Sequence, residues 1–280
     1  MSHYLRPNTL EEAVQVLAQQ GGSILSGGTD FFPALGDMPV TGTVIDISAI
    51  GSMKGILSSA RERRIGGLTT WSDIVASSLP CSFDALKMAA REIGGIQIQN
   101  RGTVAGNLCN ASPAADSVPP LLVLDAEVEL VSAIESRRVP LSEFIVGNRK
   151  TKRRPDEILA AVIVPRTIDD ANSVFLKLGA RRYLVISIAM VAVAVKTDAS
   201  GRITDARIAV GACSATAQRL PDLERDLVGA PARIGVGALV RRQHLLPLAP
   251  IDDVRATADF RMDAALTLIS RALDNCVQKG

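Results

Sequence analysis

Two segments rich in glycine and small polar residues are the parts of this chain best suited to bind an anion. The first reads Ser-Gly-Gly-Thr-Asp at residues 26–30, after an apolar pair at residues 24–25. The second reads Asn-Arg-Gly-Thr-Val-Ala-Gly-Asn-Leu-Cys-Asn-Ala-Ser-Pro-Ala-Ala-Asp at residues 100–116. Small residues let main-chain N–H groups approach a phosphate closely, and a ring of such groups forms an anion-binding nest. Two separate nests suit the two phosphates of a dinucleotide better than the one phosphate of a mononucleotide.

Ordinary turns are the alternative interpretation of both segments, because Gly-Gly pairs also occur at residues 66–67 and 94–95. Neither segment is a standard nucleotide fingerprint, since the chain has no Gly-x-x-x-x-Gly-Lys sequence and no Gly-x-Gly-x-x-Gly unit. These absences argue against a P-loop and against a classical NAD site. For Asp116, whose carboxylate could accept hydrogen bonds from ribose hydroxyls, a helix or turn cap is the alternative.

The pattern around these segments predicts the elements that position them. A capping box of Thr-Leu-Glu-Glu at residues 9–12 begins a helix that ends at residues 21–22. Thr29 is predicted to cap a short helical turn after the first loop. The strands and helices predicted up to Pro165 are strands at 24–25, 44–47, 64–66, 127–131 and 158–164, a short helix capped by residues 70–73, and a helix at 82–93.

The pattern changes after Pro165, where strands come first and helices follow. We predict strands at 174–178, 186–196 and 203–212, and helices near 218–228 and at 258–276. Strands followed by helices are typical of an α+β fold. The predicted organisation is a first domain of residues 1–165, with subdomains of about 1–55 and 56–165, and a smaller α+β domain of residues 166–280 with an antiparallel sheet.

Composition and charge exclude several function classes. The chain has 280 residues, 47% of them hydrophobic, which is enough for a sizeable core. A net charge of +2 and an aromatic content of 3% argue against nucleic-acid binding. The basic run at residues 149–154 is interpreted as a solvated loop or a partner contact. The longest apolar run, residues 183–195, is too short to cross a bilayer and is predicted to be a buried strand.

Cysteines and histidines give no support to a metal site or a catalytic residue in this chain. Cys81, Cys109, Cys213 and Cys276 lie far apart with no Cys-x-x-Cys, so buried free thiols are predicted and not an iron–sulfur or zinc site. The two histidines are His3, near the start, and His244, in a segment that resembles a tail. No secretory signal is visible in residues 1–10, so a cytoplasmic location is expected, although a partner chain could carry an export signal.

The two segments together resemble the FAD-binding subunit of the molybdenum hydroxylases, a group that contains xanthine dehydrogenase, aldehyde oxidoreductases and carbon monoxide dehydrogenase. The resemblance covers essentially the whole chain and extends to residues 156–165, 175–182 and 254–261. It implies an FAD-binding domain of the vanillyl-alcohol-oxidase-like (PCMH-type) fold. The domain after it would be like the C-terminal domain of the carbon monoxide dehydrogenase flavoprotein.

The resemblance also implies which residues bind FAD, without a covalent bond. Backbone amides of residues 26–30 and 103–107 would hold the pyrophosphate, Asp116 would lie near a ribose, and Lys177 would approach the pyrimidine end of the flavin. Tyr183 would lie near the exposed face of the ring. The implied FAD-binding residues are Leu25, Ser26, Gly27, Gly28, Thr29, Asp30, Phe31, Ile93, Gly94, Thr103, Val104, Ala105, Gly106, Asn107, Asp116, Leu159 and Lys177.

Two positions depart from the family pattern. Ala105 stands where relatives commonly have Gly, and its methyl group disfavours a positive φ and close phosphate approach. Gln99 replaces a residue that is frequently basic, which puts an ionic contact there in doubt.

By the same resemblance, the chain would belong to a three-chain complex. A large chain would carry the molybdopterin cofactor and oxidise the substrate, and a small chain would carry two [2Fe–2S] clusters. Electrons would pass from those clusters through FAD to NAD, a quinone, oxygen or another acceptor. The alternatives are a self-contained FAD-dependent oxidase or reductase, and a flavin-free scaffold that kept the fold for assembly.

Overall fold

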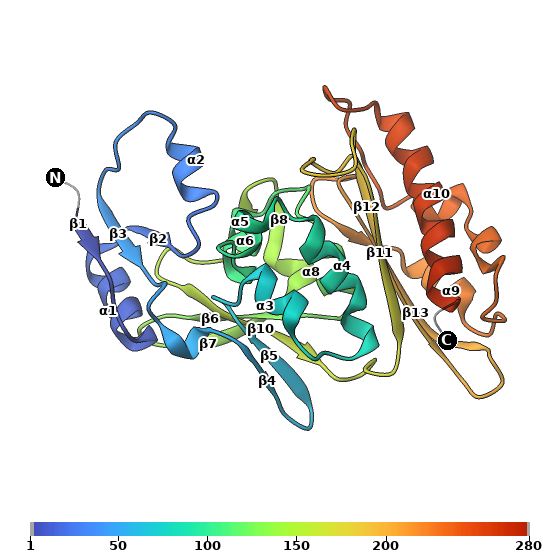
Figure 1. Cartoon of the computed structure of the whole chain (residues 1–280), viewed down its shortest axis with the longest axis horizontal. Helices are drawn as coiled ribbons and strands as arrows, with labels where there is room; N and C mark the ends of the chain where they lie inside the picture. The colour runs from blue at the N-terminus through green and yellow to red at the C-terminus, as the bar shows by residue number, and fades with distance from the viewer. Residues whose placement is uncertain (1–2, 279–280) are drawn as a thin grey trace.

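Three main β-sheets follow one another along the chain and lie side by side across the molecule (Figure 1). The computed structural model describes residues 3–278. Among the described residues, no helix is long and apolar enough to span a membrane.

The first sheet is parallel and small. It contains β1 (His3–Leu5), β2 (Ser23–Leu25) and β3 (Thr43–Asp46), in the order β1-β3-β2. Helix α1 (Leu10–Gln20) buries Ala13, Val14 and Leu17 in the core of this region, and α2 (Phe31–Leu35) follows the first glycine loop.

Two predicted helix caps in this region need correction. Thr9 Oγ1 accepts a hydrogen bond from the N–H of Glu12, but the Glu12 carboxylate accepts from the N–H of Asn8, so the predicted capping box is only half formed. Helix α2 is preceded by Asp30, whose side chain makes no cap bond, so the prediction that Thr29 caps it was wrong. The Asp30 carboxylate is hydrogen-bonded elsewhere, to the side chain of Asn110.

The second sheet is antiparallel and forms the middle of the molecule. Its order is β4-β5-β10-β6-β7, and the central strand β10, which has a neighbouring strand on both sides, is buried along almost its whole length. The strands are β4 (Ile56–Ser58), β5 (Glu62–Gly66), β6 (Glu127–Val131), β7 (Ser136–Pro140) and β10 (Ile158–Pro165).

Short helices cover one side of this sheet, and they carry the second glycine-rich segment (Figure 1). The predicted cap of Thr70 is present, with a full capping box between Thr70 and Asp73. These helices, with one hairpin, are α3 (Trp71–Ala76), α4 (Asp84–Glu92), α5 (Ile96–Gln99), α6 (Val104–Asn110), α7 (Val118–Val123), α8 (Leu141–Phe144) and the hairpin β8 (Ile145–Gly147) and β9 (Lys150–Thr151); 3₁₀ turns lie at Gly51–Met53 and Cys81–Phe83.

The third sheet is antiparallel, in the order β11-β12-β13-β14, and is covered on both faces. Helices α4 and α7 lie against one face, and α9 and α10 lie against the other (Figure 1). Its strands are β11 (Asn172–Leu178), β12 (Ala189–Thr197), β13 (Ile203–Gly211) and β14 (Gln218–Arg219); the helical elements are α9 (Pro221–Leu227), 3₁₀ turns at Val236–Leu239 and Arg242–Leu245, and α10 (Ala258–Val277).

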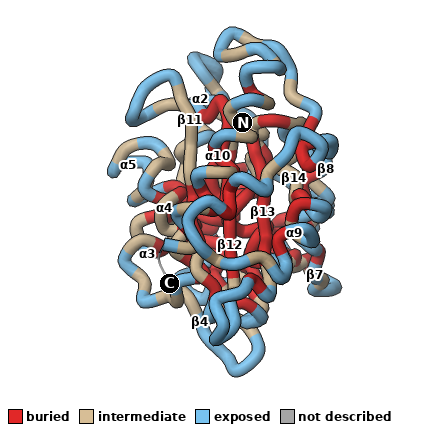
Figure 2. The backbone as a smooth tube through the Cα atoms, turned by 90° about the vertical axis from the view of Figure 1, so that its right-hand side faces the viewer, coloured by how far each residue is buried: buried red, intermediate tan, exposed pale blue. Residues whose placement is uncertain are grey.

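Alternate residues of β12 enter two different cores. Met190, Ala192 and Ala194 join the core of the middle region, whereas the alternating valines of the same strand join the core under α10. Strand residues point to opposite faces in turn, so a strand covered on both faces is apolar at every position. Figure 2 accordingly shows β12 and β13 as a continuous buried band.

Several local predictions fail in this region. Residues 183–188 are not the start of a strand, since Tyr183, Leu184 and Ile186 are exposed and β12 begins only at Ala189. Residues 218–219 form the short strand β14, so the predicted helix begins later, at Pro221.

The thiols and the second histidine also differ from expectation. Cys213 and Cys276 are buried as predicted, but Cys109 is only partly buried and Cys81 is exposed. His244 does not lie in a tail, because its ring is buried and contacts the carboxylate of Asp226.

Candidate cofactor-binding site

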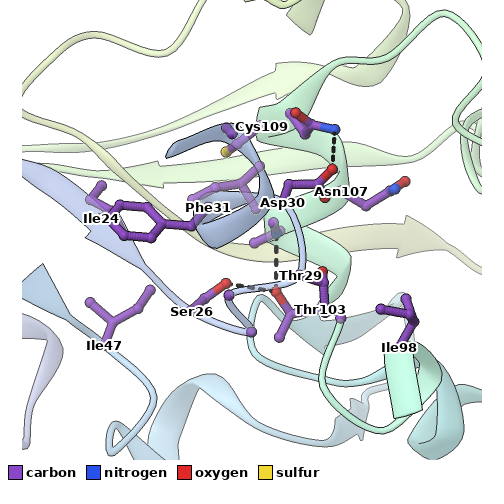
Figure 3. A pocket seen from close by; sticks show the side chains of 18 of the residues that line it. Ile24, Ser26, Thr29, Asp30, Phe31, Ile47, Ile98, Thr103, Asn107 and Cys109 are labelled. Carbon is purple, nitrogen blue, oxygen red and sulfur yellow. Dashed lines mark hydrogen bonds between the residues drawn. The ribbon is translucent and has the colours of Figure 1, made fainter. Parts of the chain in front are cut away.

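A cavity of about 340 Å³ lies between the first sheet and the helices of the middle region (Figure 3). One part of its wall is apolar, with Ile24, Ile47 and Phe31 on the side of the first sheet. The opposite part is polar and comes from the first glycine loop and helix α6. A cleft that is apolar on one side and rich in polar groups on the other suits a cofactor with both planar rings and phosphates.

Most residues that the sequence singled out line this one cavity. Those in its wall are Ser26, Gly27, Gly28, Thr29, Asp30, Phe31, Ile93, Thr103, Ala105, Gly106, Asn107 and Leu159. Leu25 and Val104 are buried in the cores beside it, and Gly94 follows the lining residue Ile93. Asp116 and Lys177 lie outside this cavity and pair with each other.

The first glycine loop presents a row of unused backbone donors. Within the described part of the chain, the amides of residues 27–30 donate no hydrogen bond to a protein acceptor. These four consecutive N–H groups lie on a cavity wall and are partly or fully exposed, so they can donate to water or to a bound anion. Gly28 has φ +77°, a left-handed conformation that glycine adopts without strain. The loop therefore has the geometry of an anion nest.

Close contacts hold the first loop against the second segment. A Cβ atom on Gly27 would lie 2.8 Å from the carbonyl carbon of Arg101 and closer still to its oxygen. The hydroxyl oxygens of Ser26 and Thr103 are 3.0 Å apart and hydrogen-bonded (Figure 3). Glycine at position 27 is thus required by the neighbouring backbone, whether or not a ligand is bound.

The second segment is the beginning of a helix and not a nest. Thr103 caps α6, with its Oγ1 accepting from the N–H of Gly106 at 3.1 Å. The amides of residues 104–107 all donate to protein oxygens: Val104 to Thr69, Ala105 to Gly67, and Gly106 and Asn107 to Thr103. The expectation that these amides cradle the pyrophosphate therefore fails for this conformation. Because Ala105 lies in a helix with no positive φ, its methyl group causes no backbone strain.

The side chain of Asn107, in α6, adds a polar group to this wall. Asn107 Oδ1 accepts a hydrogen bond from Ser117 Oγ at 2.6 Å. The amide is thereby oriented, and its NH2 group remains available to a ligand.

Asp116 is engaged at both carboxylate oxygens. Lys177 Nζ lies 2.6 Å from Oδ2, and Ser187 Oγ donates to Oδ1 at 2.5 Å. Burial raises the pKa of Asp116, against the opposing effects of the Lys177 ammonium and the two hydrogen bonds. Asp116 thus joins the loop before α7 to β11 and to the segment before β12, and among the described residues its carboxylate accepts no backbone N–H as a helix or turn cap would.

Lys177 faces a second cavity of about 400 Å³. Its wall includes Glu92, directly before the Ile93 that lines the first cavity, and two further cations, Arg181 and Arg182. Tyr183, expected near a flavin face, does not line either cavity; it is exposed and stacks beneath the Arg182 guanidinium.

Sequence reasoning missed several residues of the first cavity. Trp71, Ile98 and Ile158 contribute apolar surface, and nothing in their local pattern separates them from ordinary core residues. Arg149 and Arg153 also line the cavity, although the basic run was interpreted as a solvated loop or a partner contact. The concentration of positive charge in residues 149–154 was the one available signal.

Cys109 lines the same cavity, yet burial raises the pKa of its thiol to about 11. A thiol with that pKa is almost entirely protonated near neutral pH and is a poor nucleophile. Its position in the wall therefore does not indicate a covalent bond to a cofactor.

Comparison with known proteins identifies the family. Residues 1–167 match the family described as the FAD binding domain in molybdopterin dehydrogenase, and residues 175–276 match the CO dehydrogenase flavoprotein C-terminal domain. The chain belongs to the family of molybdenum hydroxylase FAD-binding subunits. The predicted family, FAD cofactor and oxidoreductase class are thereby confirmed.

Individual relatives agree with this membership along the full chain. The xanthine dehydrogenase FAD-binding subunit of Escherichia coli O157:H7 is 30% identical over 98% of this chain and 95% of its own length. The nicotinate dehydrogenase FAD-subunit of Eubacterium barkeri is 34% identical over 81% of this chain and 80% of its own.

Solved structures of carbon monoxide dehydrogenases share the fold. The enzyme from Hydrogenophaga pseudoflava has a chain with a TM-score of 0.87 and 26% identity, covering 99% of this chain and 97% of that one. The reconstituted enzyme from Oligotropha carboxidovorans has a chain with a TM-score of 0.90 and 24% identity, covering 100% of this chain and 99% of that one. The predicted α+β fold of an FAD-binding subunit is confirmed.

The residues of the first cavity fit an FAD. The free amides of residues 27–30 offer hydrogen-bond donors to the oxygens of a pyrophosphate. The apolar wall offers a place for a planar ring. A Cβ atom on Gly106 would lie 2.9 Å from Thr103 Oγ1 and 3.2 Å from Ser26 Oγ, so any larger residue would disturb the polar wall.

Proposed function

We propose that this family member holds one FAD non-covalently between residues 24–31 and the helix α6, and that it transfers electrons as one subunit of an oxidoreductase complex. Bound FAD accepts one or two electrons, so it can connect a one-electron donor to a two-electron acceptor. The single observation that carries the site is the row of free amides at residues 27–30 on the wall of the cavity.

The chain's own residues have distinct roles in this proposal. The amides of residues 27–30 donate to the pyrophosphate, and the hydroxyls of Ser26 and Thr103 keep the loop against α6. The Asn107 amide, oriented by Ser117, adds a directional donor. Ile24, Ile47 and Leu159 exclude water from the apolar part of the cavity. The amides of α6 contribute indirectly, because they fix the helix to the carbonyls of Gly67 and Thr69.

Lys177 is proposed to supply a fixed positive charge at the second cavity. Its side chain is 8% exposed, and Asp116 holds its ammonium group in place. A buried cation stabilises negative charge that develops on a bound group more strongly than an exposed cation does. In this arrangement Asp116 acts on Lys177 and not on a ribose.

The relatives are named as subunits or chains of dehydrogenases, and this chain is likewise a subunit of a larger assembly. We propose, by analogy with that group, a large molybdopterin-binding chain and a small chain with two [2Fe–2S] clusters as its partners. The electron acceptor is proposed to be NAD, a quinone or oxygen, and a cytoplasmic location remains our prediction. The division into residues 1–165, with subdomains of about 1–55 and 56–165, and residues 166–280 is also kept as a proposal.

The test uses the purified full-length chain. Acid precipitation should release about one FAD per chain into the supernatant, whereas flavin retained in the pellet would contradict non-covalent binding. FMN in place of FAD would contradict a site built for two phosphates. A protein with no affinity for added flavin would support the flavin-free scaffold.

A second measurement separates an electron-transfer subunit from a self-contained flavin enzyme. Mixed anaerobically with purines, aldehydes or aromatic heterocycles, the isolated flavoprotein should keep its visible absorbance. Reduced nicotinamide or dithionite should still reduce an artificial dye through it. Rapid bleaching by one of the organic compounds would show that this chain has its own substrate site.

A further inference from the structure

Three polar side chains form a continuous hydrogen-bonded relay along the edge of the first cavity. Arg149 Nη1 donates to Asn110 Oδ1 at 2.6 Å, and Asn110 Nδ2 donates to Asp30 Oδ1 at 3.1 Å. All three residues line the cavity. Asp30 lies in the loop after β2 and points toward α6 (Figure 3), whereas Asn110 ends α6 and Arg149 lies in the turn between β8 and β9. The relay therefore joins the two walls of the cavity.

The chemistry at both ends fixes the orientation of the central amide. A guanidinium group only donates hydrogen bonds and an ionised carboxylate only accepts them. Asn110 must therefore turn its oxygen toward Arg149 and its NH2 group toward Asp30. Donation from a cation to the amide oxygen also makes the amide N–H groups better donors, because hydrogen bonds in a chain polarise one another.

A neutral amide in the middle leaves part of Asp30 free. A direct Arg–carboxylate pair is commonly bidentate and would occupy both oxygens. Here only Oδ1 is used, and no described residue donates to Oδ2. Asp30 does not cap α2 either. The carboxylate is thus held in one orientation while one oxygen remains available on the cavity side.

We propose that Arg149 is a positioning residue for dinucleotide binding. Acting through Asn110, it holds Asp30 so that Oδ2 accepts a hydrogen bond from a sugar hydroxyl of the bound cofactor. This inference rests on the proposed FAD site. It assigns a role to a residue in the basic run, and it moves the sugar-binding carboxylate from Asp116 to Asp30.

The backbone at Arg149 allows a clean test. Its φ is +55°, in the left-handed region, and its N–H donates to the carbonyl of Ala111 at 2.9 Å, which fixes the turn to the end of α6. Glycine adopts that φ without strain, so Arg149→Gly removes the side chain and preserves the turn. Lys150, the next residue, is a matched control, because it is exposed, does not line the cavity, and has no side-chain partner among the described residues.

The experiment measures the rate of FAD release from the full-length holoprotein, followed by the rise in flavin fluorescence after dilution. Arg149→Gly should release FAD about fivefold faster, a modest effect because the relay is exposed to solvent. Arg149→Lys should restore part of the loss, and Lys150→Met should match the wild type. Urea unfolding of the apoproteins verifies that Arg149→Gly is folded.

A double-mutant cycle with Asp30→Asn separates positioning from a general structural role. If Arg149 acts through Asp30, then Arg149→Gly adds little to the release rate in the Asp30→Asn background. Equal acceleration in both backgrounds, or a wild-type release rate in Arg149→Gly, overturns the inference. Loss of FAD binding by the wild type itself would overturn the proposed function instead, so the two failures are distinguishable.

Discussion

Replacing Gly27 with alanine tests the loop contact on which the proposed site depends. The added Cβ would lie 2.8 Å from the carbonyl carbon of Arg101 and 3.2 Å from the Cα of Gly102, whereas ordinary contacts begin at 3.4 Å. Both neighbours are backbone atoms, so the loop must shift by more than half an ångström. A shift of that size should break the hydrogen bond between the hydroxyls of Ser26 and Thr103. It should also move the free backbone amides of residues 27–30 away from the pyrophosphate.

The size of the effect follows from the bonds that the shift removes. Hydrogen bonds to a charged group contribute about 1.5–3 kcal/mol each, so losing one or two of them weakens FAD binding by about 3 kcal/mol. That corresponds to a Kd about 100-fold higher. Gly51→Ala is the matched control, because no atom lies within 4 Å of its added Cβ and its φ is not in the left-handed region.

The assay is titration of the apoprotein with FAD, with flavin fluorescence as the signal and thermal unfolding as the check on folding. Gly27→Ala should remain folded and bind FAD weakly, and Gly51→Ala should bind it like the wild type. A Gly27→Ala protein that binds FAD within about twofold of the wild type would refute the close contact, or the role of this loop in binding.

Two further predictions concern titratable groups. The hydrogen bond from the Arg255 N–H, with others from Arg261 and Ala256, lowers the pKa of Asp253 from 3.8 to about 2. Ionised Asp253 therefore stabilises the fold above about pH 4, and this contribution is lost as the pH falls through about 2. Asp253→Asn should weaken the pH dependence of the unfolding free energy between these two pH values. An unchanged dependence would contradict the lowered pKa of Asp253. Iodoacetamide near neutral pH should modify the exposed Cys81 before the partly buried Cys109, whose pKa is about 11. Equal modification of the two thiols in peptide mass spectrometry would contradict the raised pKa of Cys109.

Local sequence signals predicted the elements well where the structure depends on neighbouring residues. The Thr70 cap, the strand β6 and the long helix α10 all lie where the pattern placed them. The small residues of 26–30 also predicted a loop on a cavity wall. In these cases the deciding interactions are caps, alternation or helical spacing, which a short stretch of sequence contains.

The failures occur where partners lie far along the chain. β12 begins at Ala189 because its pairing with β11 ends at Leu178, so the apolar residues before it have no strand to join. Residues 104–107 form a helix since their amides reach carbonyls at residues 67 and 69 as well as Thr103. Asp116 meets Lys177 only because the third sheet folds against α7.

The cavity residues that escaped prediction share this cause. Arg149 contacts Asn110 across 39 positions of sequence, and no local pattern in a basic run separates such a contact from a solvated charge. The free amides of residues 27–30 could be expected from their glycines, but the engagement of the amides in α6 could not.

The two cores that share β12 have a consequence for building hybrid proteins from this family. Met190, Ala192 and Ala194 belong to the hydrophobic core of the FAD-binding region, although they lie in the region matched by a separate C-terminal family. Cutting the chain near residue 166 would leave α4 and α7 without their apolar cover. A hybrid with a relative should therefore exchange the whole chain. Alternatively, it should exchange the C-terminal region together with the residues of α4 and α7 that pack against it. The two proposed domains therefore share packing across the boundary near residue 166, and we expect each to depend on the other for its stability.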